Sequence, residues 1–232
     1  MPFEKMTMAD GAAIDVYRVT PSGTRKGGLV LIQEIFGVTE HIRELCDDYA
    51  KDGYEVLAPA LYDREHPGFQ AGYNDAQFAR AIELARVLHP IELSVSDIQT
   101  CVTALVDKGP VFITGYCYGG TMSFLAACRV KGLSAASGYY GGHIMPFIDE
   151  KPMCPTMLHF GRFDESIPMK DVEAIAAAHP DVTVHVYEAG HGFNSDRRKD
   201  YHEPSADLAH ERTLALFKAF GDNRYIRPTA IL

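Results

Sequence analysis

The segment 111–127 constrains the fold of this chain more than any other part of the sequence. It begins with the strand-like run V-F-I-T, continues with a G-x-C-x-G pentapeptide around Cys117, and ends in the helix-forming run T-M-S-F-L-A-A. A turn this sharp between a strand and a helix leaves almost no room for side chains two residues before and after its centre. Gly115 and Gly119 meet that demand. The pattern therefore predicts a nucleophile elbow with Cys117 at its tip.

A cysteine at this position has the surroundings that a thiolate nucleophile needs. The helix dipole and the free N–H groups of the first helical turn favour a negative charge on Cys117. The N–H of Tyr118 would point to the place where an oxyanion develops. The alternative is a buried packing cysteine in a glycine-rich turn, which is the interpretation we give to the cysteines at positions 46, 101, 128 and 154.

A cysteine nucleophile needs a base, and the base needs an orienting acid. In α/β hydrolases the order along the chain is nucleophile, acid, histidine. Asp164 follows the strand-like run M-L-H-F-G, and His191 follows V-H-V-Y-E-A between two glycines, so both are predicted in loops after strands. The competing candidates near strand ends or in the same loops are His143, His159, Glu165 and Asp196, whereas His66, His89, His179 and His202 are interpreted as solvated.

Alternation of strands and helices along the chain predicts the α/β class, with a mostly parallel twisted sheet and helices on both faces. Residues 1–232 contain no internal repeat or linker, so we expect a single domain of the α/β-hydrolase fold with no large cap, and residues 63–73 as the rim of the site. Predicted strands are 16–19, after a turn at 10–11, then 29–32, 54–58, 111–114, 135–140, 156–160 and 182–187; predicted helices are 39–53, 74–88, one starting near 94, and 205–220.

Composition narrows the classes of function. A net charge of −9 argues against general nucleic-acid binding, because no basic surplus exists to neutralise phosphates. No apolar run approaches the length of a membrane-spanning helix. Five cysteines, none with C-x-x-C spacing, and a first segment without the features of an export signal favour free thiols in the cytoplasm. No metal motif or phosphate loop is apparent, so we expect no cofactor, and a monomer is the default expectation.

Several segments together resemble the dienelactone hydrolase (carboxymethylenebutenolidase) family over nearly the whole chain. The resemblance implies a cysteine hydrolase that opens a small lactone or ester through a thioester intermediate. The segments that carry it are Gln33–Val38, Pro59–Tyr62, Gly115–Gly120, Tyr139–Gly141, Tyr187–Phe193 and His210–Thr213.

The resemblance also implies roles for residues that spacing does not single out. Glu34 would lie beside the resting thiol, help to deprotonate it and then swing away, and the N–H of Ile35 would be the second oxyanion donor. The alternative for Glu34 is a strand-end carboxylate held by backbone N–H groups. Family arginines bind the substrate carboxylate; the nearest candidates are Arg80 and, a few residues after the histidine motif, Arg197. Ser195 aligns best with the second family arginine, Arg197 and Arg198 lie just beyond it, and both of these arginines could equally be surface charges.

Three other functions stay open at this point. The first is an esterase or thioesterase of broad specificity with the same triad. The second is a non-catalytic binding or sensor module that has kept the fold. The third is transfer of the acyl group to an acceptor other than water. In each enzymatic reading the partner is a small-molecule ester or lactone, with no nucleic acid and no membrane involved.

Overall fold

The computed structural model describes residues 3–72 and 74–221 of the chain. They form an α/β domain on an eight-stranded sheet of order β1-β2-β4-β3-β5-β6-β7-β8. The pairs β1–β2 and β2–β4 are antiparallel and all the others are parallel, which confirms the expected mostly parallel sheet. The strands are β1 (Phe3–Thr7), β2 (Ala13–Val19), β3 (Gly27–Ile32), β4 (Tyr54–Pro59), β5 (Val111–Tyr116), β6 (Ala135–Tyr139), β7 (Thr156–Gly161) and β8 (Thr183–Tyr187).

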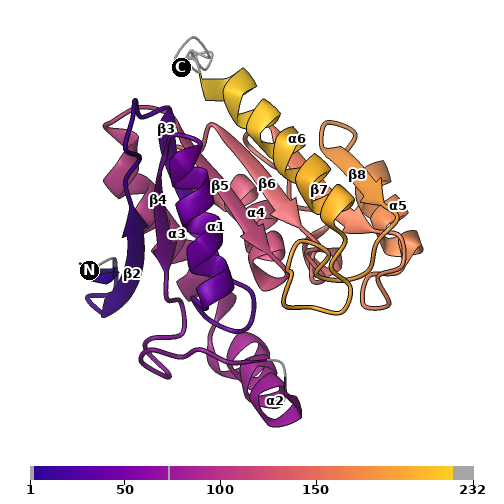
Figure 1. Cartoon of the computed structure of the whole chain (residues 1–232), viewed down its shortest axis with the longest axis horizontal. Helices are drawn as coiled ribbons and strands as arrows, with labels where there is room; N and C mark the ends of the chain where they lie inside the picture. The colour runs from indigo at the N-terminus through magenta and orange to yellow at the C-terminus, as the bar shows by residue number, and fades with distance from the viewer. Residues whose placement is uncertain (1–2, 73, 222–232) are drawn as a thin grey trace.

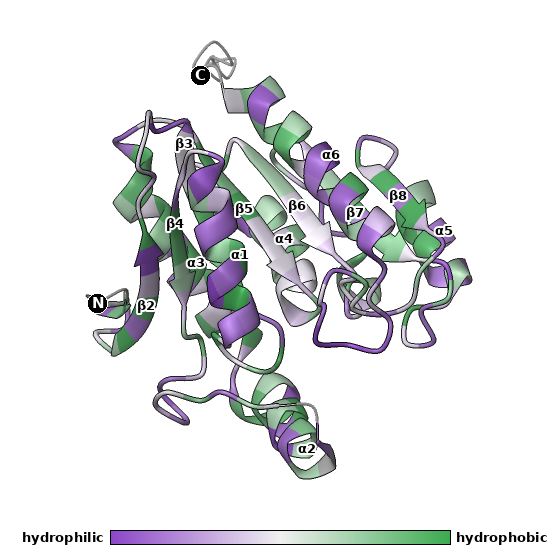
Figure 2. Cartoon of the chain, in the orientation of Figure 1, coloured by the Kyte–Doolittle hydropathy of each residue, from purple (hydrophilic) through white to green (hydrophobic). Residues whose placement is uncertain are grey.

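Helices cover both faces of the sheet (Figure 1). α1 and α6 lie in front of it and α3 and α4 behind it, and every residue of the central strands β3, β4 and β5 is buried between these layers. Figure 2 shows the resulting contrast between hydrophobic central strands and the hydrophilic outer surface of α1. The helices are α1 (Glu40–Lys51), α2 (Asp75–Glu83), the π-helical turn η1 (Leu84–Leu88), α3 (Ile91–Val106), α4 (Tyr118–Arg129), the short 3₁₀ helix η2 (Met145–Phe147), α5 (Met169–Ala178) and α6 (Glu203–Gly221).

The predicted starts of the helices agree best with the structure where a capping residue marks them. Thr39 is the N-cap of α1, and Asn74 caps α2 by accepting a hydrogen bond from the N–H of Gln77 at 3.0 Å. Two predictions were wrong in detail. The helix predicted from 74 to 88 changes to a π-helical turn at Leu84, and α3 starts three residues before the expected Ser94 because Pro90, with its fixed φ of −64°, introduces it.

The parallel strands bring distant parts of the sequence to one edge of the sheet. Glu34 follows β3, Cys117 follows β5, Asp164 follows β7 and His191 follows β8. Because the carboxyl ends of parallel strands share an edge, these four residues gather there. The segment α2–η1 projects beyond this edge (Figure 1). The prediction of one domain over residues 1–232 extends past the described residues at both ends.

Candidate active site

Cys117 lies at the tip of a strained turn between β5 and α4. Its backbone has φ +54° and ψ −110°, a conformation that residues with side chains rarely adopt. A Cβ added at Gly115 would lie 2.3 Å from the carbonyl oxygen of Gly119, and one added at Gly119 would lie 2.3 Å from that of Ile32. The two glycines are therefore required by close backbone approach, as the pentapeptide predicted.

His191 and Asp164 complete a hydrogen-bonded line with the thiol. The Nε2 atom of His191 lies 3.3 Å from the Sγ atom of Cys117, and its Nδ1 atom lies 2.6 Å from the Oδ2 atom of Asp164. Asp164 is buried, and its Oδ1 atom accepts hydrogen bonds from the N–H groups of Ser166 and Ile167. The carboxylate is thus fixed by its own loop and holds the imidazole toward the sulfur.

The charges of this line favour a protonated imidazole. Burial alone would lower the pKa of His191, but a charged Cys117 sulfur and the hydrogen bond to Asp164 outweigh it and raise the pKa of His191 to about 10. These interactions favour a proton on the imidazole beside the sulfur. A cysteine paired with an imidazolium at a helix N-terminus is the arrangement of an activated thiol.

Two backbone donors lie next to the thiol with no other hydrogen-bond partner. Within the described part of the chain, no hydrogen bond uses the N–H of Tyr118 or the N–H of Ile35. Tyr118 is the first residue of α4, and Ile35 lines the same cavity as Cys117. Free N–H groups in this position can hold a developing oxyanion.

Glu34 is a buried carboxylate that faces an arginine. It is fully buried, and neither of its carboxylate oxygens has a hydrogen-bond partner among the described residues. Its nearest cation is Arg198, whose Nη1 atom lies 3.6 Å from Oε1. The backbone N–H groups that the alternative interpretation of Glu34 required are thus not bonded to it. The hydroxyl of the buried Tyr140 also lacks a partner, and this residue has a strained φ of +38°.

The two arginines expected to meet a substrate carboxylate point elsewhere. Arg80 is bound to Glu83 on the same face of α2, and Arg197 is bound to Glu44 at 2.6 Å and to its neighbour Asp196. The structure thus does not bring Arg80 and Arg197 to the cavity that contains Cys117, whereas Arg86, from η1, and Arg198 line it.

A buried hydrogen-bond chain reaches the site from its other side, and no sequence pattern indicated it. The hydroxyl of Tyr118 lies 2.8 Å from Ser94 Oγ, which lies 3.0 Å from Nε2 of His89. The Nδ1 atom of His89 lies 3.0 Å from a carboxylate oxygen of Glu65. His89 and His179 are buried, so their interpretation as solvated residues was wrong.

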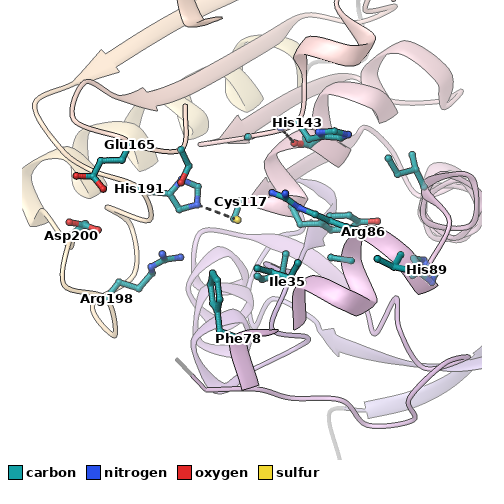
Figure 3. A pocket seen from close by; sticks show the side chains of 18 of the residues that line it. Ile35, Phe78, Arg86, His89, Cys117, His143, Glu165, His191, Arg198 and Asp200 are labelled. Carbon is teal, nitrogen blue, oxygen red and sulfur yellow. Dashed lines mark hydrogen bonds between the residues drawn. The ribbon is translucent and has the colours of Figure 1, made fainter. Parts of the chain in front are cut away.

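These residues surround one cavity of about 780 Å³ (Figure 3). Its walls come from the loop after β3, from α2 and η1, from the start of α3, from the elbow and from the loops after β6, β7 and β8. Residues 63–72 do not line it, so the rim predicted at 63–73 is wrong for its described part; Tyr73 lies outside the described residues. The projecting segment α2–η1 provides the rim instead.

The fold, the elbow and the order of Cys117, Asp164 and His191 define an α/β hydrolase. A sequence model of the dienelactone hydrolase family matches residues 14–221. A carboxymethylenebutenolidase of Pseudomonas putida is 31% identical over 216 residues, which cover 88% of this chain and 91% of the relative. A relative from Synechocystis that carries this name provisionally is 32% identical over 82% of this chain and 85% of its own length.

Comparison with solved structures points to the same family. A protein from Klebsiella pneumoniae, provisionally named dienelactone hydrolase, superposes with a TM-score of 0.81 at 29% identity, covering 93% of this chain and 98% of that protein. The chain belongs to the dienelactone hydrolase family. It is a hydrolase of carboxylic esters, which confirms the family and the enzyme class expected from the motifs and disfavours the non-catalytic module. No helix among the described residues is long and apolar enough to cross a membrane.

Proposed function

We propose that the protein hydrolyses a small ester or lactone of the dienelactone type through a thioester on Cys117. The observation that carries the proposal is the line of hydrogen bonds from Asp164 through His191 to the sulfur. The thiolate attacks the ester carbonyl, and the N–H groups of Tyr118 and Ile35 hold the oxyanion. Loss of one such donor typically costs about 10²–10³ in rate.

The alcohol or enolate then leaves with the proton that His191 carries, and the acyl group stays on Cys117. His191, held by Asp164, next removes a proton from water, and the resulting hydroxide releases the acid. A thiolate leaves a tetrahedral intermediate more readily than an alkoxide does. The enzyme should therefore favour substrates with a stabilised leaving group, such as the enolate of an enol lactone.

Arg86 is our candidate for binding a substrate carboxylate. It lines the cavity from η1, and its charge helps to lower the pKa of His143, for which burial is the larger cause. Figure 3 shows its guanidinium on the other side of Cys117 from His191. We expect Arg86→Gln to raise KM for an ester with a carboxylate near its carbonyl and to leave a neutral ester unaffected. Arg80→Gln, which changes the arginine paired with Glu83, is the matched control.

The decisive experiment compares the first turnover of p-nitrophenyl acetate by the wild type and by Cys117→Ala. A rapid release of nitrophenol, followed by a slower steady rate, is expected for the wild type and should be lost in the variant. Mass spectrometry of the quenched wild type should find an added acetyl group on Cys117. Equal behaviour of both proteins would disprove the cysteine route. Values of kcat/KM for a dienelactone and for this ester then separate a lactonase from a broad esterase.

A further inference from the structure

The cavity is not uniform in chemistry. One wall of the cavity is built by α2, η1 and the start of α3. Figure 3 shows Arg86 of this wall on the side of Cys117 that faces away from His191, and Phe78 of α2 between Ile35 and Arg198. The charged groups of the C-terminal loops, Glu165, Arg198 and Asp200, lie on the His191 side. The apolar side chains of the first wall are Ile35, Phe78, Ile82, Ala85, Val87 and Ile91.

Two of the polar residues of this wall, His89 and Tyr118, are hydrogen-bonded through Ser94, whereas Arg86 and Glu92 also line the cavity here. Glu65 accepts from Nδ1–H of His89, so Nε2 of that ring must accept the hydroxyl proton of Ser94, and Ser94 Oγ in turn accepts from Tyr118. Each donor of the chain is thus used within it. His89 and Tyr118, which line the cavity, therefore present ring surface rather than free N–H or O–H groups to a ligand.

Exposed apolar side chains line the same cavity, Phe78 and Val87 from α2 and η1 and Phe163 from the loop after β7. They are three of the eight large hydrophobic residues that are exposed among the described residues. Val87 is 74% exposed, although a large apolar side chain in water is unfavourable. Such a cluster at the mouth of a pocket indicates contact with an apolar ligand.

We propose that this apolar wall binds the acyl group of the substrate, and that this group carries an extended alkyl or aryl arm. The assignment rests on the proposed thioester route. His191 must reach the leaving oxygen and then the attacking water, so the leaving alcohol occupies the side of His191 and the acyl group occupies the opposite side, where the apolar wall lies. A volume of about 780 Å³ suits a ligand of many heavy atoms and exceeds what one small lactone ring needs.

A series of p-nitrophenyl esters from acetate to octanoate tests the proposal, because the leaving group stays constant while the acyl arm grows. Burial of one methylene group corresponds to about a four-fold gain. We expect kcat/KM to rise two- to four-fold per methylene over the first several carbons. Rates independent of chain length, or falling with it, would contradict the proposal.

Two variants distinguish a specific binding site for the acyl arm from a general affinity for hydrophobic esters. Ile82→Trp fills the apolar wall and should lower kcat/KM for the octanoate at least ten-fold more than it lowers kcat/KM for the acetate. Leu208→Trp enlarges a residue on α6 that is 40% exposed and is not part of the cavity, and should leave the series unchanged. An unchanged preference in Ile82→Trp would overturn the assignment.

Failure of this proposal is distinct from failure of the thioester route. If nitrophenol release depends on Cys117 but not on the acyl length, the chemistry stands and the acyl arm is wrong. If release persists in Cys117→Ala, the thioester route itself is wrong, whatever the length dependence. The far-UV circular dichroism spectrum and the urea midpoint of Ile82→Trp show whether this variant has folded.

Discussion

The Nη1 atom of Arg198 lies 3.6 Å from the carboxylate of Glu34, which is itself buried within the site. A carboxylate without hydrogen bonds in the protein interior is costly unless a cation compensates it. Arg198 supplies that cation, and Arg198 also lines the cavity. A substrate anion that binds Arg198 would therefore compete with Glu34 for the same guanidinium. This relation gives Glu34 a partner other than the thiol, whose own hydrogen bond is to His191.

Removal of the Arg198 guanidinium should affect both the stability of the protein and its catalytic activity. We expect Arg198→Gln to lower the free energy of unfolding by about 1–3 kcal/mol, below the ~3–5 kcal/mol seen for wholly buried pairs because the guanidinium keeps some contact with water. Arg197→Gln, which removes an adjacent surface charge, should cost less than about 1 kcal/mol. Urea denaturation of both variants measures the difference. Equal losses would mean that Glu34 does not depend on Arg198.

The thiols should differ sharply in reactivity. Burial, with a smaller effect of Glu150, raises the pKa of Cys128 to about 12, and burial also raises the pKa values of Cys46 and Cys101. At pH 7 only about one in 10⁵ Cys128 thiols is then ionised, whereas the sulfur of Cys117 lies 3.3 Å from Nε2 of His191 at the N-terminus of α4.

We therefore expect brief treatment with iodoacetamide at pH 7 to alkylate Cys117 in preference to these three cysteines. Peptide mapping by mass spectrometry identifies the modified residue, and loss of esterase activity should follow the extent of Cys117 labelling. The result is contradicted if Cys128 reacts as fast as Cys117. Raising the pH from 7 to 9 should increase the labelling of Cys128 about a hundred-fold, because its ionised fraction rises ten-fold per unit.

The sequence predicted those parts of the site that depend on local backbone geometry. Cys117 could be chosen because Gly115 and Gly119 stand where a Cβ would lie 2.3 Å from a backbone carbonyl oxygen. Asp164 and His191 could be chosen because loops after parallel strands meet at one edge of the sheet. Their roles in catalysis remain predictions, whereas their proximity is a consequence of the fold.

Side-chain direction within a loop could not be predicted in the same way. Arg197 and Arg198 are neighbours, and only the path of the chain after Gly192 decides which one turns inward. Gly192 has φ +78°, and a Cβ there would lie 2.6 Å from the side chain of Arg198. Absence of that Cβ lets Arg198 pack inward, while Arg197 binds Glu44 at the surface.

Contacts between residues from different parts of the fold could not be predicted from the sequence either. Glu65, His89, Ser94 and Tyr118 come from four separate parts of the fold and share no spacing that signals a hydrogen-bond chain. Only the packing of α3 against α4 brings Ser94 to the hydroxyl of Tyr118. His89 was therefore interpreted as a solvated loop residue, although tertiary contacts bury it.

The energetic coupling between Ser94 and Tyr118 in this hydrogen-bond chain can be measured directly. Ser94→Ala removes the shared partner of His89 and Tyr118, and leaving buried polar groups unpaired should cost about 1–3 kcal/mol of unfolding free energy. Tyr118→Phe should cost less, because the ring remains. If the hydrogen bond is real, the double variant should be more stable than the sum of the single losses by about 0.5 kcal/mol or more. Additive losses in guanidinium denaturation would exclude the coupling.

The buried His159 should make the protein sensitive to mild acid. Its ring lies fully buried between β6, β8 and α6, where Nδ1 meets the hydroxyl of Tyr187 at 2.8 Å and Nε2 meets Ser137 Oγ at 3.1 Å. Burial lowers the pKa of His159 well below its usual value, and the neighbouring charges of His185 and Arg212 lower it further. In the unfolded chain His159 therefore binds a proton with a pKa near 6.5, whereas in the native state its ring stays neutral at this pH.

The contribution of His159 to the free energy of unfolding must then fall as the pH drops below about 6.5, because at this site the unfolded state binds a proton that the native state does not, and the slope of this contribution with pH is positive. For one such histidine the loss between pH 7.5 and 5.5 is about 1.4 kcal/mol. We expect His159→Gln, measured by urea denaturation at both pH values, to reduce the wild-type difference by about that amount, whatever its absolute stability. His66→Gln, which replaces an exposed histidine, should keep the wild-type difference. If His159→Gln also keeps the wild-type stability difference between the two pH values, the native state accepts a proton at His159 and burial does not hold the ring neutral.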